Sequence, residues 1–283
     1  MKRIVTIQDI SCLGKCSLTA ALPVISAMGV ETAVLPTAVL STHTMFEGAV
    51  IRNLEDQIEP VSRHWESLQF HFDAVYTGYL ASHRQIDLVK DFFRRFGKED
   101  TLRFVDPAMA DYGKLYSGFD GTFPAAMASL CGEADIIVPN ITEACLMTGA
   151  PYRTDPDEAY IRELLERLAA LGTRRAVVLT GVTPDSGKTG VSCLDLREGR
   201  FFSLSQEKLP RSYHGTGDLF ASVTLGALMR DFSLEEALRL AADFVGAAIA
   251  ETIAHDPGKT YGTDFEAVIP LLTDAVRKGP GSR

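Results

Sequence analysis

The chain has 283 residues, of which 46% are hydrophobic and 23% are charged, and this composition excludes a disordered or fibrous protein. Its formal net charge of -9 and the lack of a basic stripe argue against nucleic-acid binding and favour a small-molecule ligand. No apolar run is long enough to cross a bilayer, and five cysteines, an odd number, favour a reducing cytoplasm without a disulfide framework.

Short apolar runs alternate with helical patterns along the first half of the chain. The runs predict strands over residues 4–8, 32–40, 74–80, 102–108 and 134–140. Pro36 predicts an irregularity in the second of these strands. Helical patterns occupy residues 17–28, which Gly29 closes, and 84–96.

The second half of the chain continues the alternation. Residues 157–171 predict a helix with an apolar face, and Gly172 is its stop signal. A strand over 175–181, a hairpin around the REGR turn and an apolar helix over 218–229 follow. Ser233 and Glu236 have the spacing of a capping box for one more helix. The tail, residues 278–283, is expected to be disordered.

The alternation of strands and helices predicts an α/β fold, a three-layer αβα sandwich with a mostly parallel central sheet. No change of composition and no linker divides the chain, so a single domain over 1–283 is expected. Ligands of such sheets bind beyond the carboxyl ends of the strands. Polar or glycine residues follow five predicted strands there: Asp9, Gly78 with Tyr79, Asp106, Asn140, and Thr180 with Gly181.

The segment SGKTG at 186–190 looks like part of a phosphate-binding Walker A loop. Five residues separate Gly181 from Gly187, however, where that loop requires four, and a predicted strand follows where a helix is required. The segment therefore predicts an exposed turn with a solvated lysine.

The sequence HGTGD at 214–218 places two glycines directly before an acidic residue and an apolar helix. Gly215 and Gly217 permit a tight turn and the close approach of a ligand. The first amides of a helix have no partner within it and form an anion site suited to phosphate. A capping role would explain Asp218 alone, but not the two glycines, so a functional role is favoured.

Further acidic and amide residues follow two of the predicted strands. Asp106 and Asp111 lie in VDPAMAD, and Asn140 and Glu143 lie in VPNITEA. Oxygen ligands of this kind suit magnesium, which proteins bind through one or two carboxylates, water and substrate phosphates. Each pair also has a plain structural interpretation, a turn for the first and a helix cap for the second. Together with the glycine turn, they favour phosphoryl transfer.

GTGD, VDPAMAD and PNITEACLMTG, with TIQD and STHT near the N-terminus, resemble the ribokinase-like superfamily, and most closely its pyridoxal, pyridoxamine and pyridoxine (vitamin B6) kinases. The similarity runs from about Ile4 to the helix after Asp218. GTGD indicates only a small-molecule kinase, whereas TIQD, STHT, TGY and DPAMAD together are more specific to the B6 branch. The resemblance implies an ATP-dependent, cytoplasmic, homodimeric enzyme that phosphorylates the 5'-hydroxymethyl group of a B6 vitamer on the salvage route to pyridoxal 5'-phosphate.

The resemblance also implies roles for individual residues. Asp218 would be the base that accepts the proton of the hydroxymethyl group, beside an anion hole formed by Gly215, Thr216 and Gly217. The ATP contacts would come from Asn140, Glu143, Thr180, Gly181, Thr216 and Gly217. Asp111 and Glu143 would hold Mg²⁺, partly through water, and Asp106 would lie with Glu143 near a K⁺-type monovalent cation.

The vitamer would contact Asp9, His43, Thr44 and Tyr79, in addition to Asp218. B6 kinases commonly carry serine where this chain has Asp9. An ionised aspartate only accepts hydrogen bonds, so it would favour a protonated ring nitrogen or an amine and leaves the preferred vitamer open. His43 as a turn residue and Tyr79 as a core residue are the plain alternatives.

Three other functions remain in competition at this point. A hydroxymethylpyrimidine kinase acts on a similar ring, but SCLGKCS only weakly resembles its glycine-rich N-terminal segment. A sugar kinase lacks support because its early Gly/Asp pattern is not evident. A non-catalytic protein that binds B6 vitamers on the same fold is disfavoured by the intact Asp218, Asp111 and Glu143.

Overall fold

The computed structural model describes residues 1–183, 185 and 187–281, which contacts divide into two units. The first unit combines Met1–Leu54 with Leu209–Arg283, and the second is Glu55–Lys208. Ser186 and Pro184 lie outside the described residues, so the turn expected at 186–190 is described only from Gly187 onward. The single domain expected from the sequence stays a prediction.

The first unit contains three paired strands: β1 (Arg3–Ser11), β2 (Glu31–Leu40) and β3 (Ile51–Asn53). β1 and β2 are parallel, and β3 is antiparallel to β2. Gln8 lies opposite Pro36 but Ile10 lies opposite Val39, so β2 contains one extra residue next to Asp9. Proline has no N–H for the ladder, and the irregularity predicted at Pro36 is confirmed.

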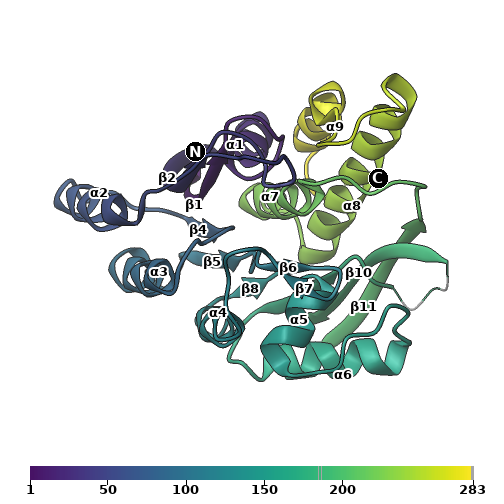
Figure 1. The fold of residues 1–283 in the computed structure, drawn as a ribbon, viewed down its shortest axis with the longest axis horizontal. Coiled ribbons are helices and arrows are strands. Elements are labelled where there is room, and N and C mark those ends of the chain that lie inside the picture. The colour runs from purple at the N-terminus through teal and green to yellow at the C-terminus, as the bar shows by residue number, and fades with distance from the viewer. Residues whose placement is uncertain (184, 186, 282–283) are drawn as a thin grey trace. The chain divides into compact units, whose positions relative to one another are not determined.

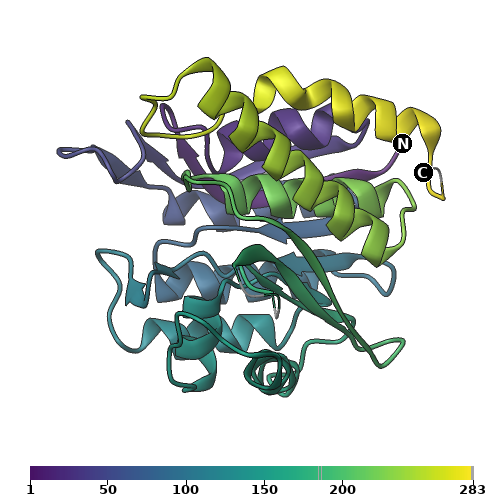
Figure 2. The same ribbon diagram turned by 90° about the vertical axis from the view of Figure 1, so that its right-hand side faces the viewer.

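Four helices belong to the same unit: α1 (Leu18–Ala27), α7 (Thr216–Met229), α8 (Leu234–His255) and α9 (Phe265–Lys278). α1 packs against β1, β2, α7 and α9, while α8 packs against both α7 and α9 (Figures 1 and 2). Every residue of α7 from Leu219 to Met229 is buried. The apolar helix is thus fixed in the core, and its more exposed first turn is held in a defined place.

The strands of the second unit follow the spatial order β11-β10-β9-β8-β5-β4. Their bounds are β4 (Ala74–Thr77), β5 (Leu102–Val105), β8 (Ile136–Ile137), β9 (Ala176–Thr180), β10 (Lys188–Asp195) and β11 (Arg200–Glu207). The pairs from β4 to β9 are parallel, and β10 and β11 form the antiparallel hairpin predicted around REGR. Nearly all residues of β4, β5, β8 and β9 are buried, as interior parallel strands require.

Five helices and a small hairpin complete the second unit (Figure 1). Their bounds are α2 (Glu55–Ser67), α3 (His83–Phe96), α4 (Phe123–Cys131), α5 (Ile141–Thr148), α6 (Glu158–Ala169), β6 (Ala110–Asp111) and β7 (Lys114–Leu115). The predicted α/β fold with mostly parallel strands is confirmed. The strand expected over 134–140 is only two residues long, because Pro139 interrupts it and Asn140 already caps α5.

α9 ends at Lys278, inside the segment expected to form a disordered tail. Gly281 donates a backbone hydrogen bond to Glu236 Oε1 over 2.7 Å, and residues 282–283 lie outside the described residues. Among the residues that the structure describes, no helix combines the length and apolar character needed to cross a membrane.

The capping box predicted for α8 provides a test of local stability. Ser233 Oγ accepts from the Glu236 amide over 3.3 Å, and the Glu236 carboxylate accepts from the Ser233 amide over 2.9 Å. Ser233→Ala should lower the free energy of unfolding by about 1 kcal/mol, because it leaves a helix amide without its partner. Urea denaturation measures the difference. Ser26→Ala, at an exposed site inside α1, is the matched control and should not destabilise the protein.

Candidate functional site

The first turn of α7 contains Asp218 and begins at a glycine that the geometry requires. Gly215 is the N-cap with a φ of 84°, and a Cβ there would overlap the carbonyl oxygen of Lys15. The carbonyl of Gly215 accepts from the Leu219 amide over 3.0 Å, which starts the helical ladder. The amides of Thr216, Gly217 and Asp218 therefore have no acceptor within the helix, and the anion site expected at this turn stays a prediction.

Asp218 lies in a setting that opposes its ionisation. Burial raises the pKa of the carboxyl to about 7, and the nearby charge of Asp9 acts in the same direction. A hydrogen bond from the backbone N–H of Ser17 partly offsets this effect by stabilising the carboxylate. A carboxyl group with this pKa can take up and release a proton near neutral pH.

Asp9 sits in β1 beside the extra residue of β2, where a bulge directs side chains away from the regular ladder. Its side chain is buried, and burial raises the pKa of its carboxyl. The hydroxyl of Ser11 donates to Asp9 Oδ2 over 3.1 Å, and the Ser17 side chain also forms a hydrogen bond with this carboxyl. Ser17 therefore stabilises the ionised form of both carboxyl groups, that of Asp9 with its side chain and that of Asp218 with its amide.

His43 forms a pair with His214, the residue directly before the glycine turn. The ring centroids are 4.3 Å apart, and His43 Nδ1 accepts from the Met45 amide over 3.1 Å. Burial and, to a smaller extent, the neighbouring His214 together lower the pKa of His43 to about 4, so the ring is neutral at pH 7. Because Nδ1 is an acceptor, Nε2 carries the proton. Thr44, the next residue, is exposed.

In the second unit, Asn140 and Glu143 form a complete capping box at the start of α5. Glu143 Oε2 accepts from the Asn140 amide over 2.8 Å, and Oε1 accepts from the Met109 amide over 3.1 Å. Burial nevertheless raises the pKa of this carboxyl to about 8, and the charge of Asp111 adds to the shift. The capping box shows that Glu143 caps the start of α5, as its plain structural interpretation predicts.

The ends of neighbouring strands bring several of the predicted residues together in this unit. Asn140 pairs with Thr180 in an isolated parallel bridge, and the Thr180 amide donates to the Pro139 carbonyl over 2.9 Å. The Asn140 side chain donates to the Ala110 carbonyl over 2.8 Å, which ties the β6–β7 hairpin to this strand end. Gly181 follows with a φ of 75°. Backbone and side-chain polar groups thus converge where β8 and β9 end.

Asp106 and Asp111 occupy different environments near that hairpin. Asp106 is buried directly after β5. Burial raises the pKa of the Cys131 thiol, and the charges of Glu143 and Asp106 add to this shift. Asp111 is exposed, and its Oδ1 accepts from the Tyr112 amide over 2.8 Å. Among residues 1–183, 185 and 187–281, no three His, Cys, Asp or Glu side chains are arranged to hold a metal ion. The carboxylates fit a Mg²⁺ that takes one or two protein ligands, with water and phosphate oxygens as the others.

Tyr79 follows β4 and lies against an aromatic cluster. Its ring centroid is 5.6 Å from that of Phe119, which in turn stacks on Phe123 at 3.9 Å. The side chain is only half-buried, so one part of the ring packs while another remains accessible. This arrangement is compatible with a ring that a flat ligand could contact.

Sequence reasoning missed three residues that the structure places at this site. Ser17 contacts two carboxyl groups, Lys15 lies against the glycine turn, and His214 pairs with His43. His214 was readable from the sequence, because it directly precedes the motif. Ser17 and Lys15 had no comparable signal, since their contacts depend on an irregular segment before α1.

Comparisons with known proteins cover most of the chain. The sequence matches the family described as phosphomethylpyrimidine kinase over residues 14–263. A candidate phosphomethylpyrimidine kinase from Bacteroides thetaiotaomicron VPI-5482, crystallised with pyridoxal, is 36% identical with a TM-score of 0.91, covering 96% of this chain and 95% of that chain. Pyridoxal kinase from Lactobacillus plantarum is 34% identical with a TM-score of 0.88, covering 97% of each chain. The hydroxymethylpyrimidine/phosphomethylpyrimidine kinase of Rhizobium meliloti (strain 1021) is 30% identical over 261 residues, which are 88% of this chain and 91% of the relative.

The raised pKa of Asp218 predicts how stability depends on pH. Its pKa is 3.8 ordinarily and about 7 in the folded protein, so stability falls as pH rises from about 4 through 7. The asparagine of Asp218→Asn cannot ionise. At pH 8 the free energy of unfolding of this variant should therefore exceed that of the wild type by on the order of 1–2 kcal/mol, a range that allows for solvent screening of a half-buried group. Urea denaturation at about pH 5 and pH 8 measures this.

The gain should be smaller at pH 5 than at pH 8. Asp274→Asn, an exposed change on α9, is the control and should show no such difference. A gain for Asp218→Asn that does not grow with pH would contradict the raised pKa.

Proposed function

Because the chain belongs to the phosphomethylpyrimidine kinase family, we propose that it transfers the γ-phosphoryl group of ATP to the 5'-hydroxymethyl group of a B6 vitamer. The resemblance to the vitamin B6 kinases of the ribokinase-like superfamily is confirmed, and the chain is a kinase. The proposed product is the 5'-phosphate of pyridoxal, pyridoxamine or pyridoxine, on the salvage route to pyridoxal 5'-phosphate. The Bacteroides relative that was crystallised with pyridoxal supports this class of acceptor.

The position of Asp218 is the observation that carries the proposal. A carboxyl group with a pKa of about 7 lies in the first turn of α7, directly after a glycine turn whose amides have no helical acceptor. An alcohol must lose its proton as it attacks phosphorus, and a transferring phosphoryl group carries negative charge on its oxygens. One short segment thus supplies a base for the first requirement and N–H donors for the second.

The proposed reaction follows from these two requirements. The acceptor oxygen attacks the γ-phosphorus while Asp218 takes up its proton, and the bond from phosphorus to the β,γ-bridging oxygen breaks to release ADP. Gly215, Thr216 and Gly217 form the anion hole that stabilises the transferring group. A base with a pKa near the working pH is ionised in a substantial fraction of the molecules and is still basic enough to accept the proton.

Residues of the second unit are proposed to bind the nucleotide and its cations. Asn140, Thr180 and Gly181 would contact ATP phosphates from the ends of β8 and β9, and Glu143 of α5 would contribute to ATP binding through Mg²⁺. Asp111 and Glu143 would hold Mg²⁺, with water between metal and protein on the side of Glu143, since backbone amides already bind its oxygens. Mg²⁺ would neutralise charge on the phosphates. Asp106, with Glu143, would lie near a bound K⁺.

The vitamer ring is proposed to contact Asp9, His43, Thr44 and Tyr79. A neutral His43 with a proton on Nε2 can donate one hydrogen bond to the substrate. Asp9 replaces a serine common in B6 kinases, and as an acceptor it would favour an amine or a protonated ring nitrogen. Its raised pKa makes this preference dependent on pH.

The proposal extends to the setting of the enzyme. The cytoplasm is proposed as its location because an odd number of cysteines, five, gives no sign of a disulfide framework. A homodimer is proposed from the resemblance to B6 kinases alone.

Hydroxymethylpyrimidine is the second candidate acceptor. The family description and the Rhizobium relative both name pyrimidine kinases, and the two substrates share a hydroxymethyl group on a nitrogen heterocycle. Direct competition between the substrates therefore belongs to the first test of function.

Purified protein incubated with Mg-ATP should phosphorylate at least one of pyridoxal, pyridoxamine and pyridoxine, and hydroxymethylpyrimidine is assayed beside them. Asp218→Asn should lower kcat by about 10²-fold or more, because an amide cannot accept the proton. ATP affinity, measured by calorimetry, should change little. Asp274→Asn is again the matched control and should retain full turnover. Product from hydroxymethylpyrimidine alone would replace the proposed acceptor, and normal turnover of Asp218→Asn would remove its assigned role.

Asp111 offers a cleaner test of the metal site than Glu143, whose substitution also breaks a helix cap. Asp111→Asn should raise the Mg²⁺ concentration for half-maximal activity by about tenfold, because it removes one negative charge. Activity is titrated with Mg²⁺ at constant free ATP. Asp120→Asn, another exposed loop carboxylate of the second unit, is the control. Equal Mg²⁺ dependence in Asp111→Asn and the wild type would argue against a role for Asp111 in metal binding.

A further inference from the structure

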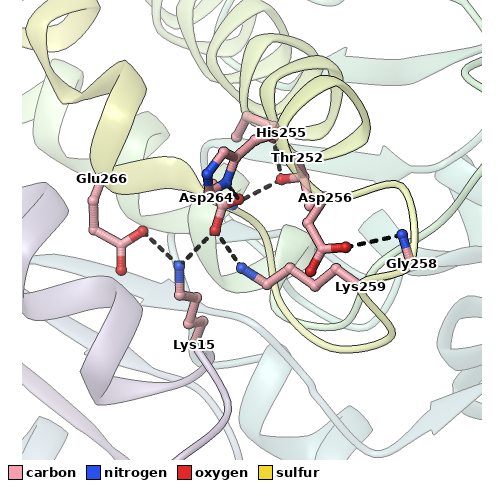
Figure 3. Close-up of polar contacts among 9 residues, drawn as sticks. Lys15, Thr252, His255, Asp256, Gly258, Lys259, Asp264 and Glu266 are labelled. Carbon is pink, nitrogen blue, oxygen red and sulfur yellow. Dashed lines mark hydrogen bonds and ion pairs between the residues drawn. The ribbon is translucent and has the colours of Figure 1, made fainter.

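Four charged residues and a histidine form an ionic cluster within the first unit (Figure 3). Lys15 Nζ lies 3.0 Å from Asp264 Oδ1 and 2.8 Å from Glu266 Oε2. The ammonium of Lys259 also binds Asp264 Oδ1, and His255 Nδ1 lies 3.2 Å from Asp264 Oδ2. Lys15 thus connects the segment before α1 with the N-terminus of α9, 249 residues away along the chain.

Asp264 is a firmly held anchor for this connection. Its amide donates to Thr252 Oγ1 over 2.8 Å, and the Thr252 hydroxyl donates to the Ala248 carbonyl inside α8 over 2.6 Å. The hydrogen bond from Lys259 and those from Lys15 and His255 hold the pKa of the Asp264 carboxyl well below its usual range. Partial burial alone would lower the pKa of Lys15, but its hydrogen bonds to Glu266 and Asp264 raise that pKa. Lys15 and Asp264 are therefore both charged at neutral pH.

The backbone that Lys15 fixes has an unfavourable conformation. Lys15 and Ser17 have φ angles of 53° and 49°, in the left-handed region that residues other than glycine rarely occupy. Such conformations persist only where surrounding contacts impose them. Two glycines permit those contacts: a Cβ at Gly215 would overlap the Lys15 carbonyl, and a Cβ at Gly262 would come within 2.7 Å of the Lys15 Cβ.

The consequence of this conformation appears two residues further on. The segment 15–17 packs directly on the glycine turn, because a Cβ at Gly215, three residues before Asp218, would overlap the Lys15 carbonyl oxygen and lie 3.3 Å from the Cys16 Cα. From this position the Ser17 amide stabilises the ionised form of Asp218, and the Ser17 side chain stabilises that of Asp9. A continuous path therefore runs from Asp264 through Lys15 and Ser17 to Asp218. The direction of the Ser17 amide depends on the backbone angles that the ion pair helps to impose.

We propose that Lys15 is a positioning residue whose ion pairs with Asp264 and Glu266 fix the segment 15–17, and thereby the amide that holds Asp218. This inference rests on the proposed function, in which Asp218 is the catalytic base. Lys15 is not assigned a contact with substrate. It acts on the reaction only through the backbone it holds.

Loss of the ion pair should change how Asp218 titrates. The groups that face Asp218 are the Asp9 carboxyl from β1 and the Cys16 thiol, whose pKa burial raises to about 12, so it is neutral. The groups around Lys15 are Asp264, Glu266, Lys259 and His255. None of them replaces the N–H of Ser17 as a donor to Asp218, so a weaker Ser17 bond leaves burial and Asp9 to raise the pKa further.

The decisive measurement is the pKa of Asp218 in the protein without substrate, from ¹³C-carboxyl NMR titration of aspartate-labelled chain, with Asp218→Asn identifying the signal. Lys15→Met should raise this pKa by about one unit. Lys15→Arg, which preserves the charge, should return most of the wild-type value. Arg239→Met removes the cation of an exposed ion pair with Glu235 in α8 and is the matched control, with no expected change.

The acid limb of the pH profile of kcat/KM should shift in the same direction in Lys15→Met, with roughly tenfold lower activity on that limb. Asp264→Asn removes the anion and leaves Lys15 in place, so it tests the same path if Lys15→Met does not fold. A lower Tm with an unchanged Asp218 titration in these variants would show a merely structural ion pair and overturn the inference. The titration needs no turnover, so a protein that phosphorylates no B6 vitamer would contradict the proposed function without deciding this inference.

Discussion

The first unit is organised around two carboxyl groups that must be kept next to each other in a poorly solvated place. Burial opposes the ionisation of both carboxyl groups, and the charge of Asp9 makes ionisation of Asp218 still less favourable. Ser17 partly offsets the effect of burial on both groups. The left-handed backbone before α1, the glycine at the start of α7 and the bulge beside Asp9 are all needed to bring these three residues together. Strain in the chain is thus concentrated beside Asp218.

The second unit also contains a buried carboxyl group, Glu143, and regular secondary structure supplies its hydrogen-bond donors. Glu143 is as deeply buried as any carboxyl in its unit, yet backbone amides of Asn140 and Met109 bind its two oxygens. The capping box that satisfies this carboxylate also fixes Asn140 at the end of β8. A helix start thus serves two purposes, because it satisfies the backbone of α5 and orders the polar strand ends. This is why the structural and functional interpretations of Asn140 and Glu143 do not exclude each other.

Features that depend on local sequence were predictable, and those that depend on distant contacts were not. Hydrophobic alternation located β1, β4, β5 and β9, and the spacing of Ser233 and Glu236 predicted the cap of α8. The helix α4 went unpredicted because it is short and has little apolar periodicity, and α2 went unpredicted because it is mostly polar and contains Pro60, a residue that usually ends a helix. At the site, the motif around Asp218 was evident. The contact of Lys15 with Asp264 was not, because nothing in either local segment indicates a partner 249 residues away.

The extra residue of β2 has an implication for how such a protein diversifies. The ladder between β1 and β2 is interrupted at Asp9 and resumes at Ile10 opposite Val39, so paired backbone holds both sides of that position. A side chain at position 9 can therefore be exchanged, for example between serine and aspartate, while the flanking register is retained. The choice of side chain at position 9 is therefore independent of the pairing of the strand. The bulge thus allows the residue at position 9 to vary while the pairing of β1 with β2 on either side stays the same.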